Sequence, residues 1–358
     1  MQRRSRRKAG AEMDTLTLND ETAEEPPSGE HPALSDDEYA LLFPGQGSQS
    51  VGMAGKVLRV YPNAEQWFTR ANEVLDYDLL HLIEHGPEGQ LNETTHSQPA
   101  IFVASVAWLE ALRDTWERAG RTLAPSVVSG HSMGQITAML AARAVDFDEA
   151  LRLVRNRAEI MHAADSLRPG GMASIIGLRD RVLRRLVGEA SDEGTLVVAN
   201  DNCPGQTVVS GDEAPLRKIM RLADEHGARR VVRLPISIAS HSPLMAGAQA
   251  HFSEAVHAIP WRDPVVPVVS NISGGLMHTR DQLSSELSEA LTAPVQWQQA
   301  VKTMAAQGST LFVEAGPGDV LSKLVRRISR TSWTFPLSDD DNGLSTRDYP
   351  DKSDGIPK

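Results

Sequence analysis

The sequence of 358 residues contains almost no cysteine and no long apolar run. Cys203 is the only cysteine, which excludes an internal disulfide and a zinc site built from cysteine pairs, so we expect no metal. This cysteine usage suits a reducing compartment, and we expect a cytoplasmic location. Apolar runs such as residues 100–107 are far shorter than the ~20 residues of a membrane-spanning helix, so we expect no membrane segment.

The sequence also lacks an excess of positive charge. Its 47 acidic residues outnumber 36 lysines and arginines, which gives a formal net charge of -11. Binding of nucleic-acid phosphates requires a cationic face, so we expect no nucleic-acid partner. The composition, with 41% hydrophobic and 23% charged residues, is that of an ordinary globular protein. The length allows one large domain and a smaller inserted unit.

Hydrophobic periodicity is absent from both ends of the chain. Residues 1–38 join a basic cluster to an acidic stretch and a Pro-Pro-Ser-Gly segment, and residues 338–358 are polar and acidic. We expect a disordered N-terminal arm and a disordered C-terminal tail. The basic start is followed by polar residues instead of an apolar segment, so we interpret it as an untargeted extension.

Between the tails, short apolar runs alternate with longer helical patterns. This alternation predicts the α/β class, with a parallel sheet covered by helices. We expect strands at residues 39–43, 127–131 and 310–313. We assign residues 39–164 and 237–337 to this large domain.

The segment 165–236 has a different rhythm. It predicts an inserted subdomain with the order βαββαβ, which is that of a ferredoxin-like unit. A cleft between this subdomain and the large domain is a common place for a ligand site. The expected strands are 172–176, 195–200, 207–211 and 230–234, and the expected helices are 179–189 and 214–225.

Residues Gly130-His131-Ser132-Met133-Gly134 match the pattern G-x-S-x-G between a predicted strand and a predicted helix. In this context the flanking glycines allow a sharp turn that exposes the serine hydroxyl, which makes Ser132 a candidate nucleophile and the large domain α/β-hydrolase-like. The alternative is a glycine turn with an incidental serine. The pattern alone is common, but its strand and helix favour the first interpretation.

A serine nucleophile needs a base, usually histidine, and the chain has eleven histidines. Most lie in predicted helices or polar loops. His131 neighbours the serine but should point away from it at such a turn. His241 follows a strand-like stretch, 234–238, and opens a new segment. From the residues alone it is a plausible base and no more.

Further along the chain, short motifs recur in a specific order, and over residues 39–337 the sequence resembles the malonyl-CoA:acyl carrier protein transacylases and the acyltransferase domains of fatty-acid and polyketide synthases. Besides the serine turn and Ser240-His241, the motifs are Phe43-Pro44-Gly45-Gln46-Gly47-Ser48-Gln49, Ser97-Gln98-Pro99-Ala100, Leu153-Val154-Arg155-Asn156-Arg157, Pro294-Val295-Gln296-Trp297 and Glu314-Ala315-Gly316-Pro317-Gly318.

The resemblance implies catalytic roles by position. Ser132 matches the acylated nucleophile and His241 its general base, a dyad without the acidic third residue of hydrolases. The backbone N–H groups of Gln46 and Met133 match an oxyanion hole. The alternative for Gln46 is a polar turn residue between glycines.

The resemblance also implies substrate contacts. Arg157 matches an arginine that binds the malonyl carboxylate, because a guanidinium can form two parallel hydrogen bonds with a carboxylate. The alternative is that it is one of three arginines on a solvated helix face. Asn200, Asn202 and Gln206 match a loop facing the cleft, where they either contact substrate or satisfy turn groups. We interpret Cys203 in the same loop as an incidental thiol.

The implied activity is transfer of a malonyl or related dicarboxylic acyl group from CoA to the phosphopantetheine thiol of an acyl carrier protein, for fatty-acid or polyketide synthesis, with no cofactor. We expect a monomer whose partners are the CoA thioester and an acidic carrier protein, which docks on a local basic patch. The candidates for this patch are Lys323, Arg326 and Arg327, and the alternative is that they form a solvated helix face. The alternatives are an acyl hydrolase or esterase with the same dyad, and a catalytically silent scaffold.

Two positions depart from the family pattern, and a third, Ser240, differs from one branch of the family. Gln135 follows the serine turn where a glutamate is common, and Ala290 lies where relatives often carry glutamine. Alanine can serve at position 290 if only its carbonyl orients His241. Ser240 before the histidine is typical of stand-alone transacylases, and malonyl-specific synthase domains commonly carry phenylalanine there. The exact acyl unit therefore stays open.

Overall fold

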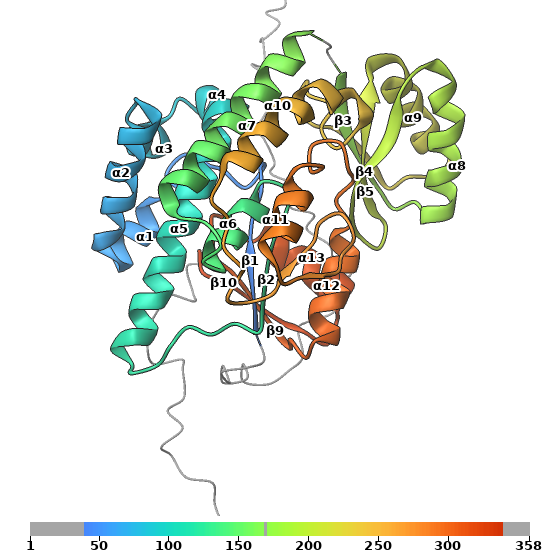
Figure 1. Cartoon of the computed structure of the whole chain (residues 1–358). Helices are drawn as coiled ribbons and strands as arrows, with labels where there is room; N and C mark the ends of the chain where they lie inside the picture. The colour runs from blue at the N-terminus through green and yellow to red at the C-terminus, as the bar shows by residue number, and fades with distance from the viewer. Residues whose placement is uncertain (1–38, 168–169, 339–358) are drawn as a thin grey trace, which may run out of the picture.

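The computed structural model describes residues 39–167 and 170–338, which form a large body and a smaller unit beside it (Figure 1). The predicted N-terminal arm, and all but the first residue of the predicted C-terminal tail, lie outside the described residues.

The large body contains a six-stranded sheet in the order β10-β9-β1-β2-β7-β8. Its strands pair in parallel except β8, which runs antiparallel to β7. The predicted parallel sheet is therefore confirmed with one antiparallel edge strand. The strands are β1 (Tyr39–Phe43), β2 (Val127–Gly130), β7 (Val268–Val269), β8 (Leu276–Met277), β9 (Leu311–Glu314) and β10 (Trp333–Pro336).

Strand β1 is buried on both faces because its side chains alternate between two cores. Leu41 and Phe43 face the core formed with α5 (Thr94–Arg118), α6 (Gly134–Ala141), α7 (Phe147–Leu167) and α10 (Ala246–Ala258). Ala40 and Leu42 face the core formed with α12 (Trp297–Ala306) and α13 (Val320–Ile328). The result is a three-layer α/β/α body.

The described part of the large body contains further helices and short 3₁₀ turns. They are α1 (Gly55–Val60), the 3₁₀ turn η1 (Pro62–Ala64), α2 (Glu65–Leu75), α3 (Leu79–His85), α4 (Glu88–Leu91), η3 (Pro243–Met245) and α11 (Arg280–Leu287). Within residues 39–167 and 170–338, no helix is long and apolar enough to cross a bilayer.

The smaller unit is a four-stranded antiparallel sheet in the order β4-β5-β3-β6, with α8 and α9 packed on one face. The chain passes through β3 (Gly170–Ile176), α8 (Asp180–Ala190), the 3₁₀ turn η2 (Ser191–Glu193), β4 (Leu196–Cys203), β5 (Gln206–Asp212), α9 (Glu213–Glu225) and β6 (Arg230–Arg233). This order and pairing are those of the predicted ferredoxin-like βαββαβ unit, and the predicted fold class is confirmed.

Two local predictions were wrong. Residues 234–238, expected to be strand-like, form no strand, since Pro235 has no N–H to donate to a ladder. Residues 201–206, expected to be a loop, are the ends of β4 and β5 joined through Pro204 and Gly205. Gly205 has φ +74, which suits a tight hairpin turn.

The two units meet along β4. The backbone of Asp201 donates to the carbonyl of Val295 (2.9 Å), and the Val295 N–H donates to the carbonyl of Ala199 (2.8 Å). This short parallel bridge extends the small sheet onto a segment of the large body. Arg327 of α13 adds a side-chain link, because its Nη1 donates to Gln206 Oε1 (2.8 Å).

Candidate active site

Ser132 lies on the turn between β2 and α6 with φ +53, in the left-handed region that non-glycine residues avoid. The two flanking glycines make this turn possible. A Cβ at Gly130 would overlap the carbonyl of Gly134, and a Cβ at Gly134 would overlap the carbonyl of Phe43 at the end of β1. The predicted strand-turn-helix arrangement is thus present, and a side chain at either glycine would disrupt it.

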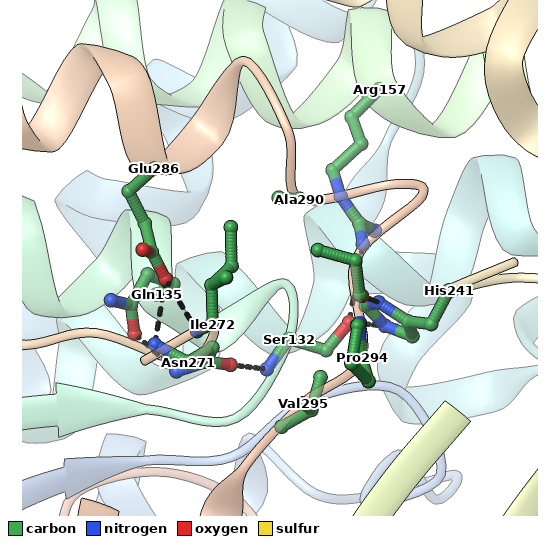
Figure 2. A pocket seen from close by; sticks show the side chains of 11 residues that line it. Ser132, Gln135, Arg157, His241, Asn271, Ile272, Glu286, Ala290, Pro294 and Val295 are labelled. Carbon is green, nitrogen blue, oxygen red and sulfur yellow. Dashed lines mark hydrogen bonds between the residues drawn. The ribbon is translucent and has the colours of Figure 1, made fainter. Parts of the chain in front are cut away.

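His241 faces the Ser132 hydroxyl, and the distance from Ser132 Oγ to His241 Nε2 is 2.8 Å (Figure 2). Its Nδ1–H donates to the carbonyl of Ala293 (3.0 Å), which leaves Nε2 free to accept a proton. The His241 N–H donates to the carbonyl of Leu291 (2.9 Å). Main-chain carbonyls therefore orient this imidazole, and the Ala290 side chain is not needed for that purpose.

The imidazole of His241 is only 4% exposed. Burial, and to a lesser degree the nearby charge of Arg157, lower the pKa of His241 to about 3, against the opposing effect of the carbonyl hydrogen bonds from Ala293 and Ala290. The ring is therefore neutral at pH 7, which is the state that a general base requires.

Arg157 projects from α7 toward the same hydroxyl, and its Nη2 donates to Ser132 Oγ (3.2 Å). It is 3% exposed, and burial lowers the pKa of its guanidinium to about 10, so it is still charged at pH 7. Among the described residues, no carboxylate pairs with it. Arg155, by contrast, pairs with Asp76 and Glu159 at the surface. The structure thus distinguishes these two arginines, which spacing alone could not do.

Besides Ser132, Arg157 has a second uncharged hydrogen-bond partner, Gln98, which the sequence did not identify. Gln98 of α5 accepts from Arg157 Nη1 (2.8 Å), and its own Nε2 donates to Gln46 Oε1 (3.3 Å). The Gln46 amide in turn donates to Thr94 Oγ1 (3.2 Å). This chain of side chains holds the guanidinium and the loop after β1 in one arrangement. The Ser-Gln-Pro-Ala motif was the available signal for Gln98.

The proposed oxyanion donors belong to two adjacent turns. A Cβ at Gly45 would overlap the carbonyl of His131, which shows how closely the loop after β1 approaches the serine turn. Within the described part of the chain, neither the Gln46 N–H nor the Met133 N–H donates to a protein acceptor. The catalytic role of both groups remains a prediction.

A polar network behind the serine was also missed. The carboxamide of Asn271 accepts from the Ser132 N–H (2.7 Å) and donates to the Gly130 carbonyl (2.8 Å) and to Gln135 Oε1 (2.7 Å). Gln135 donates to the carbonyl of Val269 (2.8 Å), a bond that an ionised glutamate at this position could not make. Glu286 lies behind Asn271 in the same pocket (Figure 2).

The asparagines expected to contact substrate lie on β4. Asn202 Oδ1 accepts from His131 Nε2 (2.9 Å), so His131 points toward the small sheet and away from the serine hydroxyl, as expected. Asn200 is buried beside the bridge to Val295. Neither is among the residues that line the pocket of Ser132, so their contact with substrate remains a prediction. Burial raises the pKa of Cys203 to about 11, which keeps this thiol protonated.

A strained serine at a strand-helix turn, in contact with a neutral and oriented histidine, is the arrangement of enzymes that form acyl esters on serine. Residues 40–336 match the family model described as the acyl transferase domain. The chain belongs to this acyltransferase family.

Named relatives support this assignment. The chain is 37% identical over 303 residues to the malonyl CoA-acyl carrier protein transacylase of Bacillus subtilis, with 84% of this chain and 94% of the relative covered. It is 37% identical to the crystal structure of the malonyl-CoA:acyl carrier protein transacylase of Xanthomonas oryzae pv. oryzae, with a TM-score of 0.80, and the match covers 85% and 95% of the two chains. A malonyl-transacylase solved in complex with its type II PKS acyl-carrier protein is 34% identical, with a TM-score of 0.81 and coverage of 85% and 97%.

Proposed function

We propose that the protein transfers a malonyl group from CoA to the phosphopantetheine thiol of an acyl carrier protein through an ester on Ser132. The observation that carries this proposal is the buried guanidinium of Arg157, 3.2 Å from Ser132 Oγ and without a carboxylate partner among the described residues. A buried charge without a counter-ion is costly. The free carboxylate of a malonyl group supplies that counter-ion beside the nucleophile.

In the first half-reaction, His241 Nε2 takes the proton of Ser132 as Oγ bonds to the thioester carbonyl carbon. The N–H groups of Gln46 and Met133 stabilise the resulting oxyanion, and one such donor contributes about 3 kcal/mol. The intermediate then collapses, the carbon-sulfur bond breaks, and His241 gives its proton to the CoA sulfur. The product is a malonyl ester on Ser132.

In the second half-reaction the carrier thiol gives its proton to His241, and its sulfur attacks the ester carbonyl. The bond from carbon to Ser132 Oγ breaks, and Oγ regains the proton. Water competes for the same ester. With the malonyl carboxylate held by Arg157, the carbonyl stays fixed in a narrow pocket where the long carrier arm can be aligned with it.

The carrier partner is supported by the relatives' names and by the solved complex of a related transacylase with its carrier. We further propose a cytoplasmic monomer, divided as the sequence predicts at about residues 165 and 236. Of the basic residues proposed for docking on α13, Lys323 pairs with Asp319 and Arg327 bonds the small sheet, whereas Arg326 is exposed.

Intact-mass analysis after incubation with malonyl-CoA, methylmalonyl-CoA or acetyl-CoA tests the proposal. We expect a malonyl adduct that Ser132→Ala abolishes. In Arg157→Ala, kcat/KM for malonyl-CoA should fall by about 100-fold, since truncating one partner of a buried charge pair costs about 3 kcal/mol. The same variant should gain relative preference for acetyl-CoA.

The competing activity is hydrolysis of an acyl group by the same dyad. A labelled malonyl group should move to the carrier protein faster than free malonate appears in solution. Predominant release of the free acid would replace the transfer proposal by an acyl hydrolase. If no adduct formed on Ser132 with any thioester, the protein would be a scaffold and not an enzyme.

A further inference from the structure

Asn271 and Glu286 take no part in the proposed proton transfers, yet both are buried and line the pocket of Ser132 (Figure 2). Glu286 projects from α11 and accepts from the Asn271 N–H (2.6 Å), the Ile272 N–H (3.2 Å) and the hydroxyl of Ser270 (2.7 Å). Both carboxylate oxygens are therefore occupied by the turn that follows β7. That turn is fixed by a side chain from another element.

The carboxamide of Asn271 is fully committed to the serine turn. The atom that faces the Ser132 N–H must be the oxygen, because an N–H can only donate, and the atom that faces the Gly130 carbonyl must be the nitrogen. The same nitrogen donates to Gln135 in the first turn of α6. One side chain therefore binds the end of β2, the nucleophile and the start of α6.

The main chain of Asn271 bonds the segment that orients the proposed base, His241. Its carbonyl accepts from the Gln296 N–H (2.6 Å), and Gln296 lies three residues after Ala293, whose carbonyl orients His241. The N–H and the carbonyl of Val295, which lies between them, both form hydrogen bonds with β4. A single residue thus connects the nucleophile, through its side chain, to the segment that holds the base, through its backbone.

We propose that Asn271, held by Glu286, is a positioning residue that sets the spacing between Ser132 Oγ and His241 Nε2. In hydrolases an acidic third residue orients the catalytic histidine. Asn271 instead holds the nucleophile and the segment whose Ala293 carbonyl accepts from the imidazole. It also occupies the Ser132 N–H, which excludes that group from the oxyanion hole and leaves Gln46 and Met133 as donors.

The physical basis is the strain of the turn. Ser132 at φ +53 and His241 at φ +57 both adopt backbone conformations that persist only when their surroundings hold them. Without the carboxamide, the partly buried serine N–H would lose its protein acceptor, and the turn could relax. Misplacement of a reacting atom by about 1 Å reduces a rate by about 100-fold.

Single-turnover acylation by malonyl-CoA, followed by quenching and intact mass, tests this inference, which rests on the proposed function. In Asn271→Ala the maximal acylation rate should fall by about 100-fold. The malonyl-CoA concentration that gives half of this rate should change by less than about 3-fold, since Arg157 is intact. Asn271→Asp keeps an oxygen toward the Ser132 N–H and should retain more of the rate than Asn271→Ala.

Glu286→Ala extends the test, with Glu314→Ala as the matched control. Glu314 is also buried and accepts two N–H groups, from Leu321 and Ser322, but at the start of α13. Both variants should unfold at lower temperature, and only Glu286→Ala should also lower the acylation rate per folded molecule, by about 10-fold or more. Circular dichroism measures the fraction of folded protein. Dividing the acylation rate by this fraction gives a rate per folded molecule even for a variant that folds poorly.

Two outcomes would overturn the inference. One is an Asn271→Ala protein that loads malonyl at the wild-type rate, and the other is an equal loss of rate in the Glu286 and Glu314 variants. The wild-type protein is measured first. If it forms no malonyl ester, the proposed function fails. If it forms the ester and the variants form it at the same rate, only the positioning role fails.

Discussion

At the scale of single residues, both proposed catalytic side chains lie on strained backbone. Ser132 and His241 are two of the four non-glycine residues with positive φ among those described. Left-handed backbone costs about 1–2 kcal/mol for such a residue. Hydrogen bonds from the Ser132 N–H to Asn271 and from the His241 N–H to Leu291 hold these conformations. The strain and the proposed chemistry coincide, as is common at functional sites.

The pKa of His241, lowered to about 3, predicts the pH dependence of acylation. Because the folded value lies below the ordinary 6.5, the imidazole stays neutral as the pH falls. The single-turnover rate should therefore be flat from about pH 8 to about pH 5. Arg157→Ala removes the second cause of the lowered pKa, so its acid limb should move to higher pH.

Acetyl-CoA serves as the substrate for both proteins in this measurement, because it has no carboxylate for Arg157 to bind. Circular dichroism at each pH shows that the protein is folded. A wild-type rate that halves near the ordinary pKa of histidine would contradict the prediction.

Single residues differed in how well the sequence revealed them. The glycines around Ser132 identify a turn from local sterics alone, so its place between β2 and α6 was predictable. His241 lies 109 positions from Ser132, and only the family resemblance selected it among eleven histidines. Asn271 and Glu286 gave no local signal, because each acts through a contact between distant elements that only the folded chain creates.

At the scale of elements, the serine turn depends on the approach of β1 to α6. A Cβ at Gly134 would overlap the backbone carbonyls of Phe43 and Pro44, which cannot move without displacing β1. We predict that Gly134→Ala lowers the free energy of unfolding by about 3 kcal/mol and abolishes acylation. Urea unfolding and intact mass measure the two effects.

The control for this prediction is Gly188→Ala in α8, where a Cβ would meet nothing within 4 Å. There the loss of glycine from a helix interior should raise the free energy of unfolding by about 0.5–1 kcal/mol. Equal effects of the two substitutions on the free energy of unfolding would show that the contact of Gly134 with β1 does not contribute to stability.

Strands that pack on both faces or alternate regularly were predictable, whereas short ones were not. β1 was predicted over the residues that it occupies, because its five residues are all buried. β7 and β8 have two residues each, too few to give a period, and their pairing is set by the neighbouring strands. The end of β4 beyond Asn200 was missed because Asp201 and Asn202 are polar, although tertiary contacts extend the strand through them.

At the scale of the whole molecule, side-chain links join the two units beside the backbone bridge at Val295. Arg327 donates to Gln206 Oε1 and to the Pro204 carbonyl. A double-mutant cycle of Arg327→Ala and Gln206→Ala should give a coupling of about 0.5–1.5 kcal/mol in urea unfolding. The acylation rate should change by less than about 3-fold, because the backbone bridge remains.

Lys323→Ala is the control for that cycle, since its partner Asp319 lies in the same local segment and not on the small sheet. Combined with Gln206→Ala it should give no coupling. A coupling near zero for the Arg327 pair would mean that α13 does not tie the small sheet to the large body.

The bridge between β4 and Val295 has a consequence for building chimaeras. Its hydrogen bonds join main-chain atoms, so they place no demand on which side chains a grafted small unit carries. Compatibility between units taken from different family members should then depend on the side-chain pairs at the seam, His131 with Asn202 and Arg327 with Gln206. A transplant that preserves these two pairs keeps both hydrogen bonds between the units, and one that mismatches them leaves partly buried polar groups without partners at the boundary between the two units.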